Sequence, residues 1–483
     1  MDTARLSSAP LLTRAERHAQ AKAMRATVPR ESLADLALPP DRDALAILDR
    51  QARHRIPFLV PERERRMAAN SFAFLRGAAA VMAADFATVP RTGLLVQAAG
   101  DSHIMNFGSF ISPEGRILFD INDFDETMAG VEFHVDVRRM VASLAVAASD
   151  AGFGKKHQRK TAAAAARAYR ERMRELAKLS PYQVWQQRVD LSLELDRIED
   201  KRLRHHIASA LRRLPADQMV DDDIPHLDSA SSGTRFQDRD GTIFHGHNPE
   251  TQALVSEAAA AFAHYPSVLP PERRHLLARY AHVDTAIKVV GVGSVGTLCA
   301  IALYLSPDGD MLVLQLKEAQ SSVNIDLVAD PALLTTGDEE GKRVVEGQHA
   351  LQAATDVFLN WIPVGSHPAA DKRRFYVRHL KTQRLSSLAD FIASDIHEAD
   401  ALIAYGELCA RTLARAHART GDPISIAAYL GSSTVFDDSL AAFATDYVAI
   451  NAADWARLNA RILRNTTEDR SGRSGSHGSA VLF

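Results

Sequence analysis

The chain has 483 residues, 46% of them hydrophobic and 24% charged, an ordinary globular composition that suits one large domain or two to three smaller ones. Its net charge of −3 and isoelectric point of about 6.7 provide no overall basic field, so we expect neither nucleic acid nor a membrane as a partner. Two cysteines exclude a disulfide framework, no apolar run has membrane-spanning length and the first residues lack a secretory signal, so we expect a cytoplasmic protein.

Residues 1–95 are predicted to form an N-terminal arm followed by a helical region. Residues 28–40 are typical of an extended arm and loop, and apolar residues at helical spacing predict a helix over 65–88. Residues 96–285 are predicted to form a mainly helical lobe with the catalytic and metal-binding chemistry, in which Asp136 is well placed as the N-cap of a helix that runs to Ser149.

Residues 286–382 are the most β-like part of the chain and are predicted to form a smaller antiparallel β lobe. Apolar strands at 298–305 and 311–317 flank a Pro-Asp-Gly turn, and a helix over 343–361 and a strand over 374–381 follow.

Residues 383–465 are expected to be helical and to return to the catalytic lobe, with an amphipathic helix over 399–420. Residues 466–483 are expected to be a disordered tail. The fold class that follows is α+β, with two lobes.

The segment from Gly100 to Glu126 concentrates carboxylate, amide and imidazole side chains between strand-like apolar pieces. Turn capping explains one or two of them but does not require the whole set. The Asp101 carboxylate can orient or deprotonate a hydroxyl, while Asn106 and Asp123 can hold Mg²⁺ against phosphates. His103 is a second catalytic candidate, with a structural hydrogen bond inside the loop as its alternative role.

The sequence "GVGSVG" at 291–296 fits the pattern G-x-G-x-x-G, but a strand follows it where a dinucleotide-binding motif requires a helix. A glycine-rich turn between two strands has another use, because its exposed N–H groups can approach triphosphate oxygens. A tight turn without a ligand is the alternative. The cofactor-binding candidates in this turn are Gly291, Gly293, Ser294 and Gly296.

Lys317 ends the second strand of this hairpin, from which a lysine can reach phosphates beneath the loop, although a strand-end lysine in solvent is the simpler interpretation. Glu346, on the helix that follows, is a candidate partner for Lys317, with Glu339 and Glu340 as rivals.

The pieces "GDSHIMN", "FDINDFDE" and "HVDVRR" together resemble the catalytic and metal-binding segments of aminoglycoside-phosphotransferase-type kinases. The resemblance implies that Asp101 is the catalytic residue, that Asn106 and Asp123 are metal ligands and that Asp136 opens a helix. It also makes "GVGSVGT" similar to the kinase phosphate loop and Lys317 similar to the lysine beneath it. ATP and Mg²⁺ are the implied cofactors, and a protein-kinase-like fold is the implied architecture.

The order of these segments is reversed relative to such kinases, in which the glycine loop and the lysine precede the catalytic loop. A circular permutation explains the reversal: the chain begins in the catalytic lobe and supplies the ATP-binding lobe late. Residues 413–422, "LARAHARTGD", then end the helix that normally leads into the catalytic loop.

Over nearly its whole length the chain also resembles a bacterial family known as domain of unknown function 2252. The pieces that carry this resemblance are "LVPERERRMAANSFAFLRGAA", "GDSHIMNFGSF", "FDINDFDET", "KVVGVGSVGT", "LQLKEAQSSV", "VVEGQ" and "LARAHART".

Three functions therefore stay open. The first is an ATP- and Mg²⁺-dependent phosphotransferase acting on an unknown small-molecule or protein acceptor, with transfer of AMP as a close variant. The second is a metal-dependent phosphoesterase, and the third is a nucleotide-binding regulator without catalysis. The phosphoesterase would use Asp101, His103, Asp120, Asp123 and His134.

Overall fold

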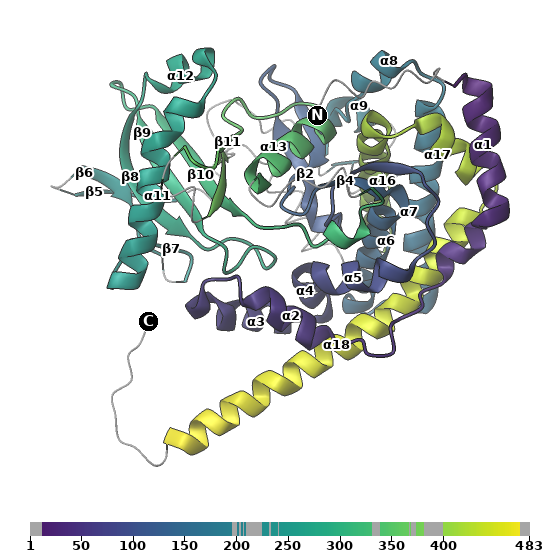
Figure 1. The fold of residues 1–483 in the computed structure, drawn as a ribbon, viewed down its shortest axis with the longest axis horizontal. Coiled ribbons are helices and arrows are strands. Elements are labelled where there is room, and N and C mark those ends of the chain that lie inside the picture. Colours follow the sequence, from purple (N-terminus) through teal and green to yellow (C-terminus); the bar gives the residue numbers. More distant parts are fainter. Residues whose placement is uncertain are drawn as a thin grey trace.

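The structure is a computed structural model with an α+β fold, and Figure 1 shows a sheet with its own helices beside a larger helical part. The residues that it describes are 12–195, 200–201, 204–205, 207–208, 225–230, 233–239, 241–330, 339–366, 368, 373–380 and 399–473.

The β part is built on a six-stranded antiparallel sheet with the strand order β11-β12-β10-β9-β8-β7. Its strands are β7 (Ile243–Phe244), β8 (Ala281–Lys288), β9 (Cys299–Leu305), β10 (Met311–Ala319), β11 (Asn360–Ile362) and β12 (Arg374–His379). The helices α11 (Pro249–Val268), α12 (Pro271–Leu277) and α13 (Glu340–Leu351) belong to this part.

Alternation of apolar side chains along β9 and β10 explains why this sheet is buried on both faces. Leu312, Leu314 and Leu316 pack in one core cluster with Phe262 and Tyr265 of α11. Side chains at the alternate positions of these strands face the opposite side of the sheet, where apolar residues form a second core cluster. That cluster contains Phe236, Ile243, Ala286, Ile301, Leu303 and Val313.

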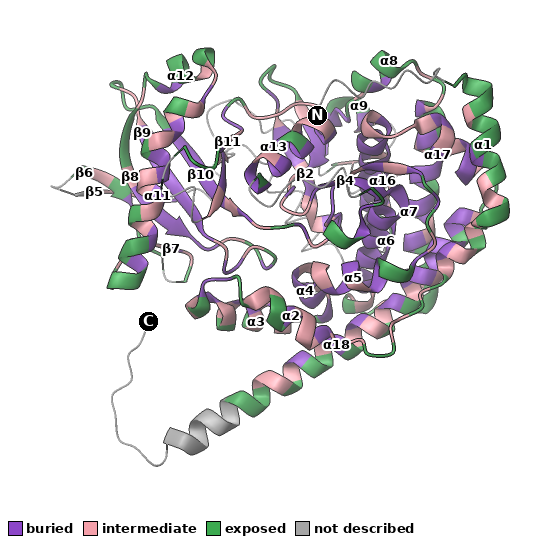
Figure 2. Ribbon diagram, in the orientation of Figure 1, coloured by how far each residue is buried: buried purple, intermediate pink, exposed green. Residues whose placement is uncertain are grey.

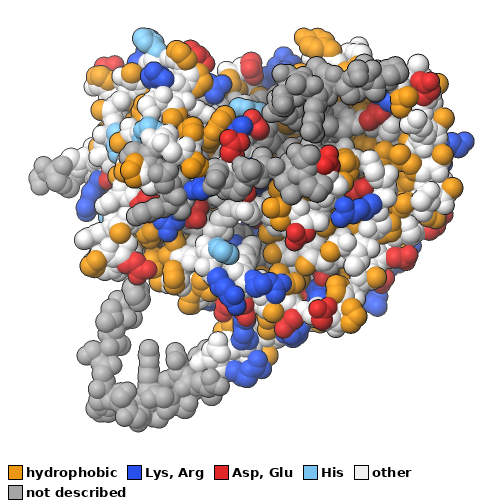
Figure 3. Space-filling model, viewed as in Figure 1, with side chains coloured by type: hydrophobic (Ala, Val, Ile, Leu, Met, Phe, Trp, Pro, Cys, Tyr) orange, Lys and Arg blue, Asp and Glu red, His pale blue; other side chains and the backbone are white. Residues whose placement is uncertain are grey.

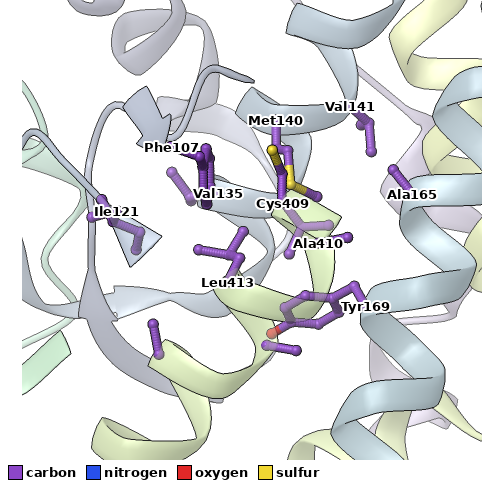
Figure 4. Packing of buried hydrophobic residues seen from close by; sticks show 14 of the residues in the cluster. Phe107, Ile121, Val135, Met140, Val141, Ala165, Tyr169, Cys409, Ala410 and Leu413 are labelled. Carbon is purple, nitrogen blue, oxygen red and sulfur yellow. The ribbon is translucent and has the colours of Figure 1, made fainter. Parts of the chain in front are cut away.

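The helical part is organised around α6 (Phe133–Asp150), in which every residue from Phe133 to Ala148 is buried. Figure 2 shows this central helix in the buried colour, with its neighbours wrapped around it. Those neighbours are α7 (Lys155–Leu176), α16 (Ala399–Thr420), α17 (Pro423–Leu430) and α18 (Val435–Arg473), with α1 (Arg14–Thr27) outside α17. Figure 4 shows Met140 of α6, Tyr169 of α7 and Leu413 of α16 in one core.

Two short, two-stranded antiparallel sheets lie between the helical core and the six-stranded sheet. The first pairs β1 (Leu95–Ala98) with β4 (Met128–Glu132), and the second pairs β2 (Phe107–Ile111) with β3 (Ile117–Ile121). The other helices before β1 are α2 (Ala44–Ala52), α3 (Val60–Ala68), α4 (Ser71–Gly77) and α5 (Ala79–Asp85). The remaining elements are α8 (Pro181–Trp185), α9 (Leu191–Glu194), β5 (Leu227–Ala230) and β6 (Gly233–Phe236).

Several sequence-based element predictions were wrong in their bounds. The predicted helix over 65–88 is three short helices, because the chain turns at Asn70 and Ala78. The predicted helix over 343–361 spans Glu340–Leu351 only. Helix α6 begins at Phe133 with Glu132 at the N-cap position, so Asp136 is a buried residue of its first turn and does not cap it.

The predicted division of the chain also differs from the structure at two places. The sheet takes strands β7 and β8, and helix α11 packs on it, so residues 243–285 belong to the β part. Helix α18 continues to Arg473, beyond the expected start of the tail at residue 466, and residues 474–483 lie outside the described residues. The helix expected over 399–420 is confirmed with those bounds.

Among the described residues, no helix is both long enough and apolar enough to cross a membrane.

Candidate functional site

The loop after β1 is held in place by the buried carboxylate of Asp136. Its Oδ2 accepts the backbone N–H of Ala99 at 2.6 Å and its Oδ1 accepts that of Gly100 at 2.9 Å. Gly100 has φ +88°, and a Cβ atom there would lie 1.8 Å from the carbonyl oxygen of Glu126, so only glycine fits. The network continues from Asp136 to His417 Nε2 at 3.1 Å, and from His417 Nδ1 to the Tyr169 hydroxyl at 2.8 Å. Helices α6, α7 and α16 thereby position this loop together.

Asp101 follows Gly100 and is oriented by an arginine that the sequence analysis did not single out. Arg139 lies on α6 and donates from Nε to Asp101 Oδ1 at 2.8 Å, while its Nη2 donates to the Leu75 carbonyl at 2.7 Å. Burial raises the pKa of Asp101, and the charge of Arg139 opposes this rise. The carboxylate is thus fixed in direction by a charged donor.

His103 lies beside Asp101, with Nε2 at 3.8 Å from Asp101 Oδ2. Burial lowers the pKa of His103 well below its usual value, and the nearby positive charge of Arg76 lowers it further. The imidazole is therefore neutral at physiological pH and does not act as a cation towards Asp101.

Asn106 and Asp123 face the same space as Asp101. The Asn106 amide nitrogen donates to the Asp101 carbonyl at 2.7 Å, which leaves the amide oxygen for another partner. The Asp123 side chain is 33% exposed, and its Oδ1 accepts the Asp125 N–H at 3.0 Å. Both oxygen-bearing groups are thus presented by short, locally hydrogen-bonded turns.

The glycine-rich turn lies between β8 and β9, as predicted. Gly291 and Gly293 are exposed, and the Ser294 N–H donates to the Gly291 carbonyl at 3.0 Å. Gly296 has φ +95° and lies against Arg55 behind the turn, so it serves the backbone shape there. The Ser294 hydroxyl donates to Asp125 Oδ2 at 3.1 Å, which ties the turn to the segment after β3.

Lys317 is buried in β10 and pairs with Asp125, not with Glu346. Its Nζ lies 2.6 Å from Asp125 Oδ2 and 3.8 Å from Asp123 Oδ2. Burial alone would lower the pKa of Lys317, but the two carboxylates outweigh it and raise that pKa above its usual value. The Tyr376 hydroxyl of β12 donates to Asp125 Oδ1 at 2.6 Å and completes the group.

The predicted partner role of Glu346 is wrong because of the phase of helix α13. The buried face of this helix contains Glu340, Val344, Gly347 and Leu351, at spacings of three and four, and Glu346 is exposed on the opposite side. Of the two rivals, Glu339 pairs with Lys342. Glu340 pairs with Arg343, which lies on its own helix.

Two adjoining cavities meet at Asp101. The first has a volume of about 520 Å³, and residues that line it include Asn106, Gly291, Lys288, Lys317, Arg378 and Leu380. The second has a volume of about 470 Å³, and its lining includes Arg55, Asp125, Glu126, Glu318, Gln320 and Arg373. Both are lined by Arg76, Asp101, Asp123, Gly293 and Ser294. Their volumes are within the range of small-molecule sites.

The donor set of the first cavity suits Mg²⁺ bound together with phosphates. Mg²⁺ is commonly held by one or two carboxylates plus substrate phosphates. Asp123 and the amide oxygen of Asn106 offer that set. Within the described part of the chain, no group of three or more His, Cys, Asp or Glu residues could hold a metal ion without such a ligand.

The fold brings together only part of the phosphoesterase set. Asp120 is buried in an ion pair with Arg415, away from either cavity lining. His134 Nε2 lies 3.1 Å from the Pro90 carbonyl, and burial lowers the pKa of His134 to about 3. Asp101, His103 and Asp123 are the three residues of that set that line the first cavity.

Sequence reasoning also missed Tyr376 and Arg378 of β12, which lie directly across from Lys317 and Gln315 of β10 and so share their face of the sheet. Arg378 donates to Gln315 Oε1 at 2.9 Å and to the Asn122 carbonyl at 3.3 Å. Only their alternation with the buried Phe375 and Val377 marks them as facing the site, and no motif surrounds them.

Comparison with known proteins identifies a family that the chain matches. The family model described as "Uncharacterized protein conserved in bacteria (DUF2252)" matches residues 55–461. No curated protein and no solved structure matches the chain.

Proposed function

The chain belongs to the bacterial family DUF2252, and within this family we propose that it is an ATP- and Mg²⁺-dependent phosphotransferase with a circularly permuted protein-kinase-like fold. Phosphate-binding and metal-binding groups come together from segments that are distant in the sequence. Lys317 and Asp125 are separated by 192 residues, yet they form an ion pair in which Lys317 lines the first cavity and Asp125 lines the second. This convergence is the observation that carries the proposal.

The order of elements in the β part supports the same proposal. A glycine-rich turn joins its first two long strands, β8 and β9, a buried lysine lies on the next strand, β10, and helix α13 follows. Protein kinases place a glycine-rich loop over the phosphates and a lysine on their third strand. The chain departs from them at the lysine's partner, because Asp125 replaces a helix glutamate.

The end of α16 supports the permutation. Gly421, just after this helix, packs against β1: a Cβ atom at Gly421 would lie 2.8 Å from Val96 Cγ1. The Thr420 hydroxyl accepts the Gln97 N–H at 3.2 Å. A helix that would lead directly into the catalytic loop of an unpermuted kinase therefore ends beside the strand that leads into Asp101.

The proposed reaction divides its tasks among the named residues. The acceptor hydroxyl donates its hydrogen bond to Asp101, its oxygen forms a bond to the γ-phosphorus, and the bond from that phosphorus to the β-phosphate oxygen breaks with its electron pair on ADP. The hydroxyl proton passes to Asp101 and then to solvent. Lys317 and the N–H groups of the glycine turn hold the phosphates.

Bound Mg²⁺, held by Asn106 and Asp123, would neutralise the charge that develops on the phosphates. The acceptor is a small molecule or a protein side chain, and transfer of AMP from the same site is the close variant. The two free and buried cysteines, Cys299 and Cys409, fit the cytoplasm as the compartment.

Radiolabelled ATP tests this proposal and separates its variants. Purified protein is incubated with Mg²⁺ and ATP labelled at the γ- or α-phosphate, with water and the chain itself as acceptors, beside Asp101→Asn. We expect γ-label in phosphate or protein and ADP as the product, with a rate at least about 100-fold lower in the variant. Transfer of α-label would favour AMP transfer. Metal-dependent release of phosphate from p-nitrophenyl phosphate, without nucleotide turnover, would favour the phosphoesterase.

A further inference from the structure

Arg76 is a cation that the described structure leaves without a hydrogen bond or an ion pair, although it lies between the two cavities. It is half-buried and lines both of them. Its Nε is buried and has no hydrogen-bond partner in the described part of the molecule. Arginine is effectively always protonated, so this position holds a positive charge with one side facing ligand space.

Arg76 differs from the arginines around it, because those arginines make hydrogen bonds or ion pairs within the protein. Arg139 donates hydrogen bonds to Asp101 and to the Leu75 carbonyl. In the second cavity Arg55 donates to the Val295 carbonyl, and Arg373 pairs with Glu257 and Glu318. These side chains hold the protein together, whereas the guanidinium of Arg76 remains for a ligand.

The surroundings of Arg76 fix its position firmly. It is the penultimate residue of α4, and the Leu75 carbonyl beside it receives Arg139. The Gly77 carbonyl accepts from Arg63 Nη2 at 2.6 Å, and Gly77 packs so closely on Met67 that a Cβ atom would lie 2.5 Å from Met67 Cγ. The end of α4 is thus anchored to the same residue that orients Asp101.

Arg76 is also close to both reacting partners of the proposed transfer. Its carbonyl oxygen lies 3.7 Å from where a Cβ atom of Gly293 would be, so α4 contacts the tip of the glycine turn. Its charge acts on Asp101, whose pKa it lowers against the larger raising effect of burial. No ion pair joins Arg76 to Asp101 in the described structure, and both residues line the same two cavities.

We propose that Arg76 binds the phosphoryl group while it passes from the nucleotide in the first cavity to the acceptor in the second. This inference rests on the proposed function and assigns a residue from the N-terminal helices, outside both lobes of the motif-based site, to the transfer step. A loose phosphoryl-transfer transition state spreads negative charge over three oxygens, and a planar guanidinium can donate two hydrogen bonds to them. The bonds made and broken are those given above, and Arg76 neither gains nor loses a proton.

The test compares binding of Mg·ADP with binding of Mg·ADP plus aluminium fluoride, which mimics the transferring phosphoryl group. Wild type is expected to bind the fluoride complex more tightly than Mg·ADP alone. Arg76→Ala should bind Mg·ADP within about twofold of wild type but lose about tenfold or more of the gain from aluminium fluoride. Arg76→Lys keeps the charge without the fork of donors and should recover part of the gain.

Arg65→Ala is the matched control, because Arg65 is an exposed arginine on neighbouring α3 that pairs with Glu62. Figure 3 shows Lys and Arg side chains gathered over this region, so the control reports any general loss of positive charge. It should retain the full gain. Thermal unfolding of Arg76→Ala should match wild type, since Arg76 makes no hydrogen bond in the described structure.

The outcomes separate the two claims. If wild type binds Mg·ADP and gains from aluminium fluoride but Arg76→Ala gains equally, the role of Arg76 is refuted while the nucleotide site stands. If wild type binds Mg·ADP without any gain, the role of Arg76 is likewise refuted. If folded wild type binds no nucleotide at all, the proposed function itself fails.

Discussion

Asp120 and Asp125 lie close together in the sequence and both pair with a buried cation, but their surroundings differ. Asp120 is 1% exposed and Arg415 0% exposed, and Asp120 also accepts the N–H groups of Ile121 and Ala353 at 2.9 Å each. Asp125 is 24% exposed, and its partners are Lys317, Tyr376 and Ser294 at the border of the cavities.

The ion pair of Asp120 is therefore buried and structural, whereas the ion pair of Asp125 is accessible to a ligand. The Asp120 pair joins β3 to α16 and to the segment after α13, and neither of its residues lines the two cavities described above. The Asp125 pair also joins distant segments, but a ligand can compete for its lysine. A buried ion pair therefore indicates a functional site here only where it borders a cavity and where one partner sits on a turn.

The largest expected effect is on folding, from Asp120→Ala. This variant leaves the Arg415 charge and two backbone N–H groups without their acceptor in the interior, so we expect the free energy of unfolding to fall by about 3–5 kcal/mol. Urea denaturation measures it. Asp125→Ala is the control and should cost less than half as much, since water in the cavity can solvate Lys317. Equal losses would remove the distinction between the two pairs.

Lys317→Met should weaken ligand binding at a modest cost in stability. Methionine fills a similar volume, and the Asp125 carboxylate that loses its lysine is 24% exposed and keeps the Tyr376 and Ser294 hydroxyls as donors. We expect the unfolding free energy to fall by less than about 2 kcal/mol, below the loss for Asp120→Ala, while the affinity for Mg·ATP falls about 10- to 100-fold, because a charged donor to the phosphates is lost. A variant that binds Mg·ATP like wild type would contradict the role of this lysine.

Glu126, next to Asp125, should make stability depend on pH. Burial raises the pKa of Glu126 to about 7, although its carboxylate accepts the Val323 N–H at 2.7 Å. The folded state then binds a proton that the unfolded state releases near pH 4.5, so stability falls as the pH rises from about 4.5 to 7 and levels off above. Glu126→Gln should remove this fall, which amounts to about 3 kcal/mol between pH 4.5 and 7. Unfolding measured across pH 4.5–8 with equal slopes in both proteins would refute the assignment.

The smallest effect is expected from Ser294→Ala. It removes one hydroxyl donor to Asp125 and should cost about 1 kcal/mol or less. The affinity for Mg·ATP should change by less than about fivefold, since backbone N–H groups of the turn are retained. Titration calorimetry checks this, and a loss as large as that of Lys317→Met would mean that the hydroxyl itself binds phosphate.

Short sequence motifs predicted those features of the fold and the site that depend on residues close together in the chain. The loop from Asp101 to Asn106, the glycine turn and the bounds of α16 follow from short motifs and from one helical period, and the structure reproduces them. The predicted pairing of Glu346 with Lys317 was wrong because the buried stripe of α13 leaves Glu346 on the exposed side of that helix.

Tertiary contacts could not be predicted in the same way. Arg139 of α6 meets Asp101 from 38 residues further along the chain, and Arg76 lines the cavities from the end of α4, beside Gly77, which packs on Met67. Tyr376 meets Asp125 from a strand 251 residues away. Such convergence is set by the fold as a whole and leaves no local pattern.

The most direct test of the central claim is calorimetric titration with Mg·ATP of wild type, Asp123→Ala and Lys317→Ala. We expect micromolar-range binding by wild type and weaker binding by both variants, because Asp123 and Lys317 border one cavity from distant parts of the sequence. No binding by folded wild type, or unchanged binding in both variants, would contradict it.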